Sequence, residues 1–283
     1  MDGEDRARRA SGGGRSNLIL RVLSGMVLAP LAIGAAAIGG LPFLLFCALA
    51  AIGIWWEWAS LSAGESARQL VTAGGGSLAA AAIFLAAGWL GTALVCIAGG
   101  TALVAALSWP HHRAWVGAGV TYAGAMLVAP VLLRADPGYG FVAILFLFAV
   151  VWTTDILAYF AGRAIGGAKL APRLSPNKTW SGAIAGAVGA VVAAATVAVM
   201  TSLGSVAAVA LVGAGLSVAS QVGDLFESTV KRLYGAKDAG TLIPGHGGLM
   251  DRLDGFIAAA LVAAALGLLR SGAEAPARGL LVW

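Results

Sequence analysis

Apolar stretches separated by short polar breaks run along almost the whole chain. Each stretch is 17 to 21 residues long, close to the roughly 20 residues that a helix needs to cross a membrane. The stretches are apolar on all sides, whereas the strands of a membrane β-barrel carry polar residues at alternate positions. The pattern predicts nine membrane-spanning helices: 22–38, 41–61, 71–87, 89–107, 115–133, 141–161, 182–200, 206–225 and 253–269.

The fold class expected from this pattern is an all-α polytopic integral membrane protein with about nine transmembrane helices and a cytoplasmic N-terminus. The polar start of the chain is interpreted as a retained basic tail ahead of the first anchor. The chain then divides into four regions: the tail at 1–21, the N-terminal helices at 22–140, the C-terminal helices at 141–270 and a C-terminal tail at 271–283. The C-terminal helices include two cytoplasmic loops, 162–180 and 224–254.

Composition and charge support this fold class and exclude a soluble domain with a single core. Of the 283 residues, 59% are hydrophobic and only 31 are charged, or 11%, against roughly 25% in soluble domains. With nine spans, all Lys and Arg except Arg134, Arg270 and Arg278 fall on the side of the N-terminus, in agreement with the positive-inside rule. The net charge of +5 therefore indicates orientation, and no nucleic-acid partner is expected.

Two polar segments on the predicted cytoplasmic side concentrate charge. Segment 162–180 contains four basic residues and no acid. Segment 224–254 contains nine of the 31 charges, and these are of both signs. Because orientation requires only Lys and Arg, the acids in this second segment need another explanation.

Carboxylates at the edge of a membrane are costly unless they are paired, hydrated or bound to a cation. Asp224 follows a long apolar stretch, and Asp251 and Asp254 lie three positions apart at the start of the last predicted helix, so they share a face. Oxygen ligands of this kind suit Mg²⁺, which is commonly held by one or two carboxylates together with water and phosphate. Ion pairs with the neighbouring Lys and Arg explain the same acids equally well, so both interpretations stay open.

Phosphate binding is a second candidate chemistry for these segments. The Gly-rich segment around His246 could bring backbone N–H groups to an anion, and His246 could transfer a proton, although a lone loop histidine more often does neither. Lys178 stands just before the seventh predicted helix, where Thr179 or Ser181 is the expected N-cap. This turn either only begins the helix or also presents Lys178 to a phosphate.

Two further acids have competing interpretations. Arg163 lies two helical turns after Asp155, so it either forms a buried bridge with that carboxylate or positions a substrate phosphate. Glu57 lies within the cluster Trp55, Trp56 and Trp58, which is typical of an aromatic belt at the membrane interface. Glu57 is therefore either a site residue or a carboxylate reaching the headgroup region.

Residues 228–254, with the sequence STVKRLYGAKDAGTLIPGHGGLMDRLD, resemble the signature of the phosphatidate cytidylyltransferases, also called CDP-diglyceride synthases. The segments DILAYFAG at 155–162 and SPNKTW at 175–180 resemble the second motif region of that family. The resemblance covers roughly the C-terminal half, and the first half is similar only in its hydrophobic spans. Ser181 stands where the family usually has Glu.

The resemblance implies a multi-pass enzyme of a bacterial-type inner (cytoplasmic) membrane, with its active site facing the cytoplasm. It implies that CTP and phosphatidic acid condense to CDP-diacylglycerol and pyrophosphate in phospholipid biosynthesis, with Mg²⁺ required. By position, Asp224 and Asp251 would be metal ligands, and Asp238 and Asp254 would support the site or hold a second, monovalent cation. The implied catalytic residues are Lys231, Arg232, Lys237, Asp238, His246 and Arg252. The implied substrate-binding residues are Arg163, Ser175, Asn177, Lys178 and Ser228.

Two other functions compete with this interpretation. A CTP-dependent kinase of lipid alcohols would share the membrane fold and the metal chemistry, but it would release CDP. A cation-coupled transporter would place its acids near the middle of the bilayer, whereas these acids cluster at the ends of predicted spans. A homodimer through Gly-rich helix faces is compatible with the sequence, although no specific motif indicates one.

Overall fold

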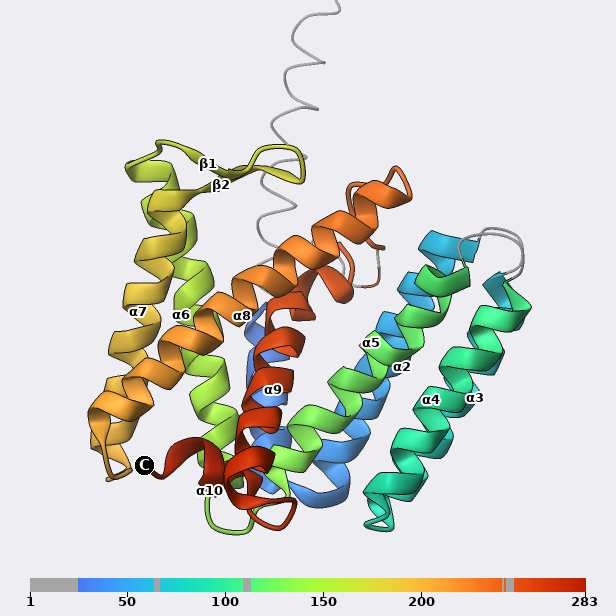
Figure 1. Ribbon diagram of the computed structural model, residues 1–283, viewed down its shortest axis with the longest axis horizontal. Helices are drawn as coiled ribbons and strands as arrows, with labels where there is room; N and C mark the ends of the chain where they lie inside the picture. Colours follow the sequence, from blue (N-terminus) through green and yellow to red (C-terminus); the bar gives the residue numbers. More distant parts are fainter. Residues whose placement is uncertain (1–24, 64–66, 109–112, 241, 243–246) are drawn as a thin grey trace, which may run out of the picture.

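Long helices pack side by side in the computed structural model, and a short β-hairpin and a short helix lie at opposite ends of the bundle (Figure 1). The structure describes residues 25–63, 67–108, 113–240, 242 and 247–283. We call the end with the hairpin the site end and the end with the short helix the far end. His246 and the tail 1–21 lie outside the described residues.

Eight of the described helices are long and apolar enough to cross a membrane, which confirms the all-α polytopic fold. A shorter apolar helix, Gly25–Ile38, lies within the first predicted span. The long helices are α2 (Gly40–Ala63), α3 (Ala67–Ala86), α4 (Leu90–Leu107), α5 (Arg113–Arg134), α6 (Gly140–Ala164), α7 (Trp180–Met200), α8 (Val206–Leu233) and α9 (Met250–Ser271).

The two polar segments differ in structure. Segment 162–180 contains the antiparallel strands β1 (Lys169–Ala171) and β2 (Ser175–Thr179), which the sequence pattern did not predict. Thr179 then caps α7, because its side chain accepts the Gly182 N–H, as expected for an N-cap. In segment 224–254, α8 continues to Leu233 instead of ending at the predicted residue 225. Asp224 and Glu227 therefore lie on a regular helix.

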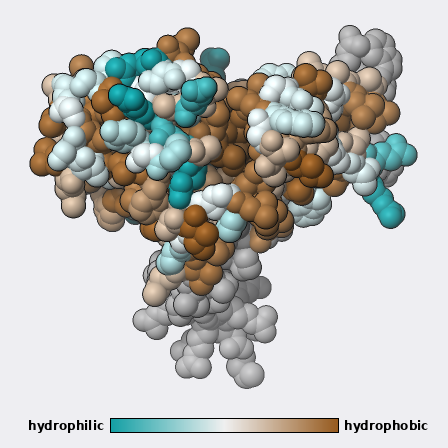
Figure 2. All heavy atoms as spheres, turned by 90° about the horizontal axis from the view of Figure 1, so that it is seen from below, coloured by the Kyte–Doolittle hydropathy of each residue, from teal (hydrophilic) through white to brown (hydrophobic). Residues whose placement is uncertain are grey.

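Small residues let the helices of the C-terminal half approach closely. A Cβ atom on Gly182 would lie 2.6 Å from the carbonyl oxygen of Ala158, and one on Gly186 would lie 2.8 Å from that of Thr154. These glycines therefore set the spacing of α6 and α7, as is common where helices pack in lipid. Hydrophobic residues cover much of the surface, and hydrophilic residues gather over part of the face seen in Figure 2.

The tryptophan cluster of α2 lies mainly inside the bundle. Trp55 and Trp58 are 0% exposed, and their indole N–H groups donate to the backbone oxygens of Val71 and Trp115. Only Trp56 is exposed. The prediction of an interfacial belt is therefore wrong for Trp55 and Trp58, because a buried backbone acceptor can satisfy an indole N–H as well as the headgroup region can.

Charges at the far end complete the backbone hydrogen bonding of the fold. Arg134 donates to the carbonyl oxygens of Ala36 and Ala37, and Arg270 donates to those of Gly279 and Val282. Arg270 also lies 3.5 Å above the ring of Trp283. These arginines hold the ends of Gly25–Ile38 and of α10 (Pro276–Leu281), since cations favour helix C-termini.

Asp136, in the loop between α5 and α6, also hydrogen bonds to backbone groups at the far end. It is 4% exposed, and its carboxylate accepts the N–H groups of Gly138, Tyr139 and Arg278. The last of these bonds ties the segment 276–281, predicted only as a tail, to the loop between α5 and α6.

Candidate active site

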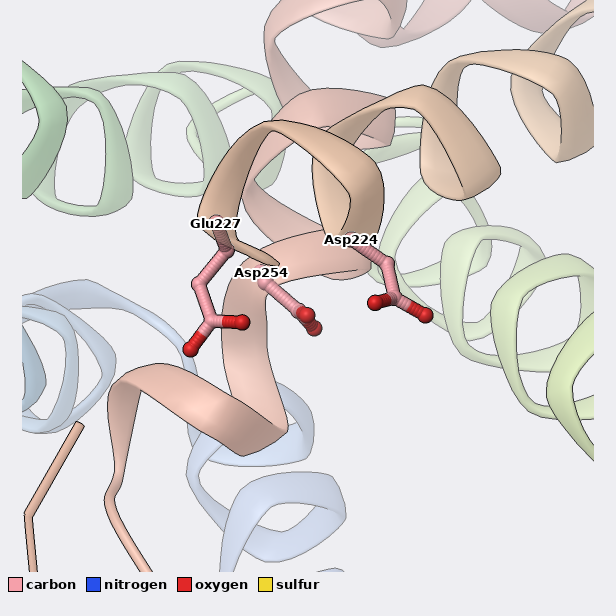
Figure 3. A group of neighbouring side chains, drawn as sticks. All are labelled: Asp224, Glu227 and Asp254. Carbon is pink, nitrogen blue, oxygen red and sulfur yellow. The ribbon is translucent and has the colours of Figure 1, made fainter. Parts of the chain in front are cut away.

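Three carboxylates from α8 and α9 meet at the site end. Asp224, Glu227 and Asp254 each offer an oxygen, and these oxygens lie within 4.8 Å of one another. Figure 3 shows Asp254 from α9 between the two acids of α8. Asp224 and Glu227 are three positions apart on a helix, so their side chains point the same way. Two of these acids were predicted as metal ligands, and Glu227 was missed.

Two glycines at the crossing of α8 and α9 allow these acids to meet. A Cβ atom on Gly223 would lie 2.5 Å from Cβ of Ala258 and 2.7 Å from the carbonyl oxygen of Asp254. One on Gly255 would lie 2.5 Å from Oγ of Ser220. Any larger side chain would push the helices apart, because such contacts are shorter than van der Waals separation. The crossing therefore brings the acid of α9 against the two acids of α8.

Glu227 combines burial with an unused hydrogen-bonding atom. Its side chain is 1% exposed, and its Oε1 has no hydrogen-bond partner among the described residues. Its other oxygen lies 2.6 Å from Nζ of Lys231. A buried carboxylate oxygen without a partner is costly, so this atom is suited to receive a ligand.

Asp251 differs from these acids because both of its oxygens are used. One lies 2.6 Å from Nζ of Lys231, and the other accepts the N–H groups of Ala239 and Gly248 at 3.0 and 2.9 Å. Lys231 therefore links Glu227 to Asp251. The predicted metal set of Asp224, Asp251 and Asp254 stays a prediction, but the structure groups Glu227, and not Asp251, with the other two.

The β-hairpin brings a lysine to the acids. Lys178 on β2 forms an ion pair with Asp224 on α8. Its neighbour Asn177 is exposed and lines the same cavity as the acids. The hairpin segment and the acid-rich segment, which are distant in sequence, thus contribute opposite charges to one site.

A cavity of about 1370 Å³ connects these charges to the apolar interior. The three clustered acids, Asp251 and several basic and polar groups line its polar part: Arg163, Lys169, Asn177, Lys178, Lys231, Asp238 and Arg252. Apolar side chains from Gly25–Ile38, α2, α5 and α6 line the rest: Leu28, Leu31, Phe43, Phe46, Leu49, Met126, Val151 and Trp152. One cavity can therefore hold a polyanion and a hydrocarbon chain together.

Arg163 does not form the bridge to Asp155 that their spacing suggested. It donates to the hydroxyl of Tyr159 at 2.7 Å and lies 5.4 Å from the centre of that ring. Both Arg163 and Asp155 line the cavity. Because its guanidinium is exposed, Arg163 is available to an anion entering from the surface.

Four of the described candidates do not line the cavity. Ser228 is buried within α8, Arg232 donates to the carbonyl oxygen of Ala236, Lys237 is exposed, and Ser175 lies at the start of β2. Their predicted roles stay predictions. Glu57, for which two interpretations were open, does not reach the headgroup region, because it is 0% exposed and contacts the start of α9. Its interpretation as a site residue stays a prediction.

The fold and cavity define a polytopic membrane protein with a site that combines charged groups of both signs with apolar walls. The chain belongs to the cytidylyltransferase family, which it matches over residues 19–269. It is 43% identical to the phosphatidate cytidylyltransferase of Brucella suis biovar 1 (strain 1330) over 263 residues, covering 92% of this chain and 97% of the relative. It is 45% identical over 247 residues to the protein of that name from Brucella abortus biovar 1 (strain 9-941), covering 87% and 91%.

Proposed function

We propose that this protein transfers the cytidylyl group of CTP to phosphatidic acid, giving CDP-diacylglycerol and pyrophosphate. Family membership and the nearly full-length similarity to the Brucella relatives support this activity. The structural observation that carries it is the single cavity, in which clustered acids and basic groups continue into apolar walls. A nucleoside triphosphate needs the charged part of the cavity. A phosphorylated diacyl lipid needs the charged part for its phosphate and the apolar walls for its chains.

In the proposed reaction, an oxygen of the phosphatidate phosphate attacks the α-phosphorus of CTP. A new P–O bond forms, and the bond from the α-phosphorus to the bridging oxygen of the β-phosphate breaks. Pyrophosphate leaves with that electron pair. Both substrates are anions, so the site must hold them together against their repulsion and stabilise charge in the transition state.

The acid cluster has the donors that a divalent cation requires. Asp224, Glu227 and Asp254 provide three oxygens within 4.8 Å of one another, and Glu227 Oε1 has no other partner among the described residues. Hard oxygen ligands of this kind fit Mg²⁺. When bound there, the cation would neutralise negative charge on the phosphates. A second, monovalent cation stays a prediction.

The basic groups of the cavity divide into two sets. Lys178, which also pairs with Asp224, lines the cavity together with Arg163 and Arg252, where they can contact phosphate oxygens of the substrates. Lys231 instead lies between Glu227 and Asp251. It limits the repulsion between these two acids and holds Glu227 in place for the cluster.

We further propose that the site faces the cytoplasm across a bacterial inner membrane. Of the eighteen Lys and Arg, only Arg134, Arg270 and Arg278 belong to the predicted opposite side, and the positive-inside rule supports that orientation. The described contacts of Arg134 and Arg270 lie at the far end, with α10. A homodimer stays a prediction.

The decisive experiment is turnover by purified protein supplied with CTP, phosphatidic acid and Mg²⁺. We expect CDP-diacylglycerol and pyrophosphate as products, and loss of turnover on chelation. A lipid-alcohol kinase would instead release CDP and a phosphorylated alcohol, and a transporter would move solute into sealed vesicles without turnover. Folded protein that forms no CDP-lipid would overturn the proposed function.

The predicted ligand set contains Asp251, whereas the set that the structure groups contains Glu227. Mn²⁺ binding, measured by electron paramagnetic resonance, can distinguish the two sets. We expect Glu227→Gln to weaken binding by roughly tenfold or more and Asp251→Asn to weaken it less, because Asp251 is already engaged by Lys231 and backbone N–H groups. The reverse order would restore Asp251 as the metal ligand in place of Glu227.

A further inference from the structure

Glu57 connects the N-terminal half of the chain to the acids of α9. It lies in α2 and is 0% exposed. Its Oε1 accepts the Leu249 N–H at 2.8 Å, and its Oε2 accepts the Met250 N–H at 2.8 Å. The two partners are 192 and 193 positions later in the sequence. Each carboxylate oxygen of Glu57 thus holds one backbone group at the start of α9.

The start of α9 needs an acceptor from elsewhere. The first N–H groups of a helix have no partner within it, and they form its positive end. The N-cap residue of α9 is Leu249, which provides no side-chain cap. Glu57 supplies acceptors for the N-cap residue and the first helical residue, and Asp251 accepts the N–H of Gly248, the residue just before the N-cap. Two carboxylates from different helices therefore complete this terminus.

The chain packs closely around the two carboxylates at two glycines, where an added Cβ atom would force a neighbouring group to shift. A Cβ atom on Gly240 would lie 2.7 Å from Oε1 of Glu57. One on Gly248 would lie 2.9 Å from Oε2 of Glu57 and 2.8 Å from Oδ2 of Asp251. Glu57 therefore contacts both the segment leading into α9 and the helix itself, which restricts where α9 can begin.

The acids of the site follow directly from this anchored start. Asp251 is the next residue after Met250, and Asp254 is one turn further on α9. A change in the position or angle of the first turn would move both carboxylates relative to Asp224 and Glu227, which belong to α8. Small displacements matter at such sites, because a misplacement of about 1 Å can cost 100-fold in rate.

We propose that Glu57 is a positioning residue for the reaction: by anchoring the first turn of α9, it holds Asp254 and Asp251 in the arrangement that turnover requires. The inference rests on the proposed function for its catalytic readout. In this role Glu57 contacts neither substrate nor cation, and it acts through the backbone of Leu249 and Met250.

The far end offers a matched control for a carboxylate with a structural role only. Asp136 is likewise buried, and it accepts three backbone N–H groups. Asp136→Asn and Glu57→Gln both replace one buried acceptor oxygen by a donor amide. The two substitutions therefore remove similar interactions, but only one of them lies at the site.

The test compares Glu57→Gln, Glu57→Asp and Asp136→Asn with the unsubstituted protein, with kcat normalised to the folded fraction. We expect Glu57→Gln to lower kcat by roughly 10- to 100-fold, as for residues that orient metal-site ligands, and to leave KM for CTP within about threefold. Glu57→Asp keeps the charge and both acceptors and should recover part of the loss. Asp136→Asn should leave kcat within about twofold.

Amide hydrogen exchange supplies a readout that does not depend on turnover. We expect Glu57→Gln to increase exchange in the peptide covering residues 247–252 by at least about tenfold, since the Leu249 and Met250 N–H groups lose an acceptor. The same peptide should be unchanged in Asp136→Asn. If the Gln variant does not fold, Glu57→Asp alone must show a smaller local increase with a reduced kcat.

Three outcomes would overturn the inference: wild-type kcat in folded Glu57→Gln, unchanged exchange at 247–252 in that variant, and an equal loss of kcat in Asp136→Asn. The last of these would show that loss of any buried carboxylate lowers kcat, wherever it lies in the bundle. Failure of the proposed function is distinguishable, because the unsubstituted protein would then form no CDP-lipid. Unchanged exchange at 247–252 in Glu57→Gln would refute the anchoring of α9 in that case as well.

Discussion

The two ends of the bundle use charge in opposite ways. At the far end, Arg134, Arg270 and Asp136 hydrogen bond to backbone groups that would otherwise lack partners. At the site end, three carboxylates lie within 4.8 Å of one another, and Glu227 Oε1 has no partner among the described residues. The far end therefore shows what this fold needs from charged residues, and the site end carries more acid than folding alone explains.

Glu57 lies at the site end, but it binds backbone groups as the charged residues of the far end do. Like Asp136, it is buried and accepts backbone N–H groups. Its hydrogen bonds satisfy the start of α9, and that helix carries Asp254 into the acid cluster. At the start of α9, the backbone groups that Glu57 binds and the cluster acid Asp254 are thus only about one turn apart.

The largest expected effect comes from an acid of the cluster. Asp254→Asn should lower turnover by roughly 100-fold or more, because it removes a carboxylate from the proposed cation site. In the presence of a chelator, its thermal stability should equal or exceed that of the unsubstituted protein, since three adjacent carboxylates repel one another. Thermal unfolding with and without chelator measures this.

A marked loss of stability in Asp254→Asn under chelating conditions would contradict the difference between the two ends. It would mean that the acid cluster contributes to folding as Asp136 does. Retained turnover would separately remove Asp254 from the site.

An intermediate effect is expected at the helix crossing. Gly223→Ala would place a methyl group 2.5 Å from Cβ of Ala258 and 2.7 Å from the carbonyl oxygen of Asp254. We expect about 1–3 kcal/mol of destabilisation from overpacking and a roughly tenfold lower turnover, because α9 must shift away from α8. Melting temperature and kcat per folded molecule measure the two effects.

Gly215→Ala is the matched control on the same helix, since a Cβ atom there would meet nothing within 4 Å. It should leave turnover within about twofold and slightly raise stability, because Ala favours a helix more than Gly does. Equal losses in both variants would show that α8 tolerates no substitution, and the crossing would then have no special role.

The smallest effect on turnover is expected at the far end. Arg270→Met removes the donor to the carbonyl oxygens of Gly279 and Val282 and the stacking on Trp283. Since Arg270 is exposed, we expect a loss of only about 1 kcal/mol in stability and an unchanged kcat. A reduced kcat per folded molecule would show that the two ends are coupled.

Most of the helices and the polar segments could be predicted from the sequence, because each depends on local pattern. An apolar stretch of membrane length must form a helix to satisfy its backbone in lipid, whatever its neighbours are. The described parts of all nine predicted ranges lie largely in helices. The hairpin at 169–179 was missed, since it consists of two strands of only 3 and 5 residues without an alternating pattern.

The sequence alone was enough to identify a polytopic membrane protein of the cytidylyltransferase family. That its chemistry lies in segments 162–180 and 224–254 stays a prediction. Which carboxylates meet depends on how the helices pack in three dimensions. Sequence spacing is the same whether or not an acid already has a partner. It therefore could not distinguish Asp251, which is held by Lys231 and two backbone N–H groups, from Glu227, whose Oε1 has no hydrogen-bond partner among the described residues. Nor could it connect Glu57 to Met250, because contacts across 193 positions arise only when helices pack.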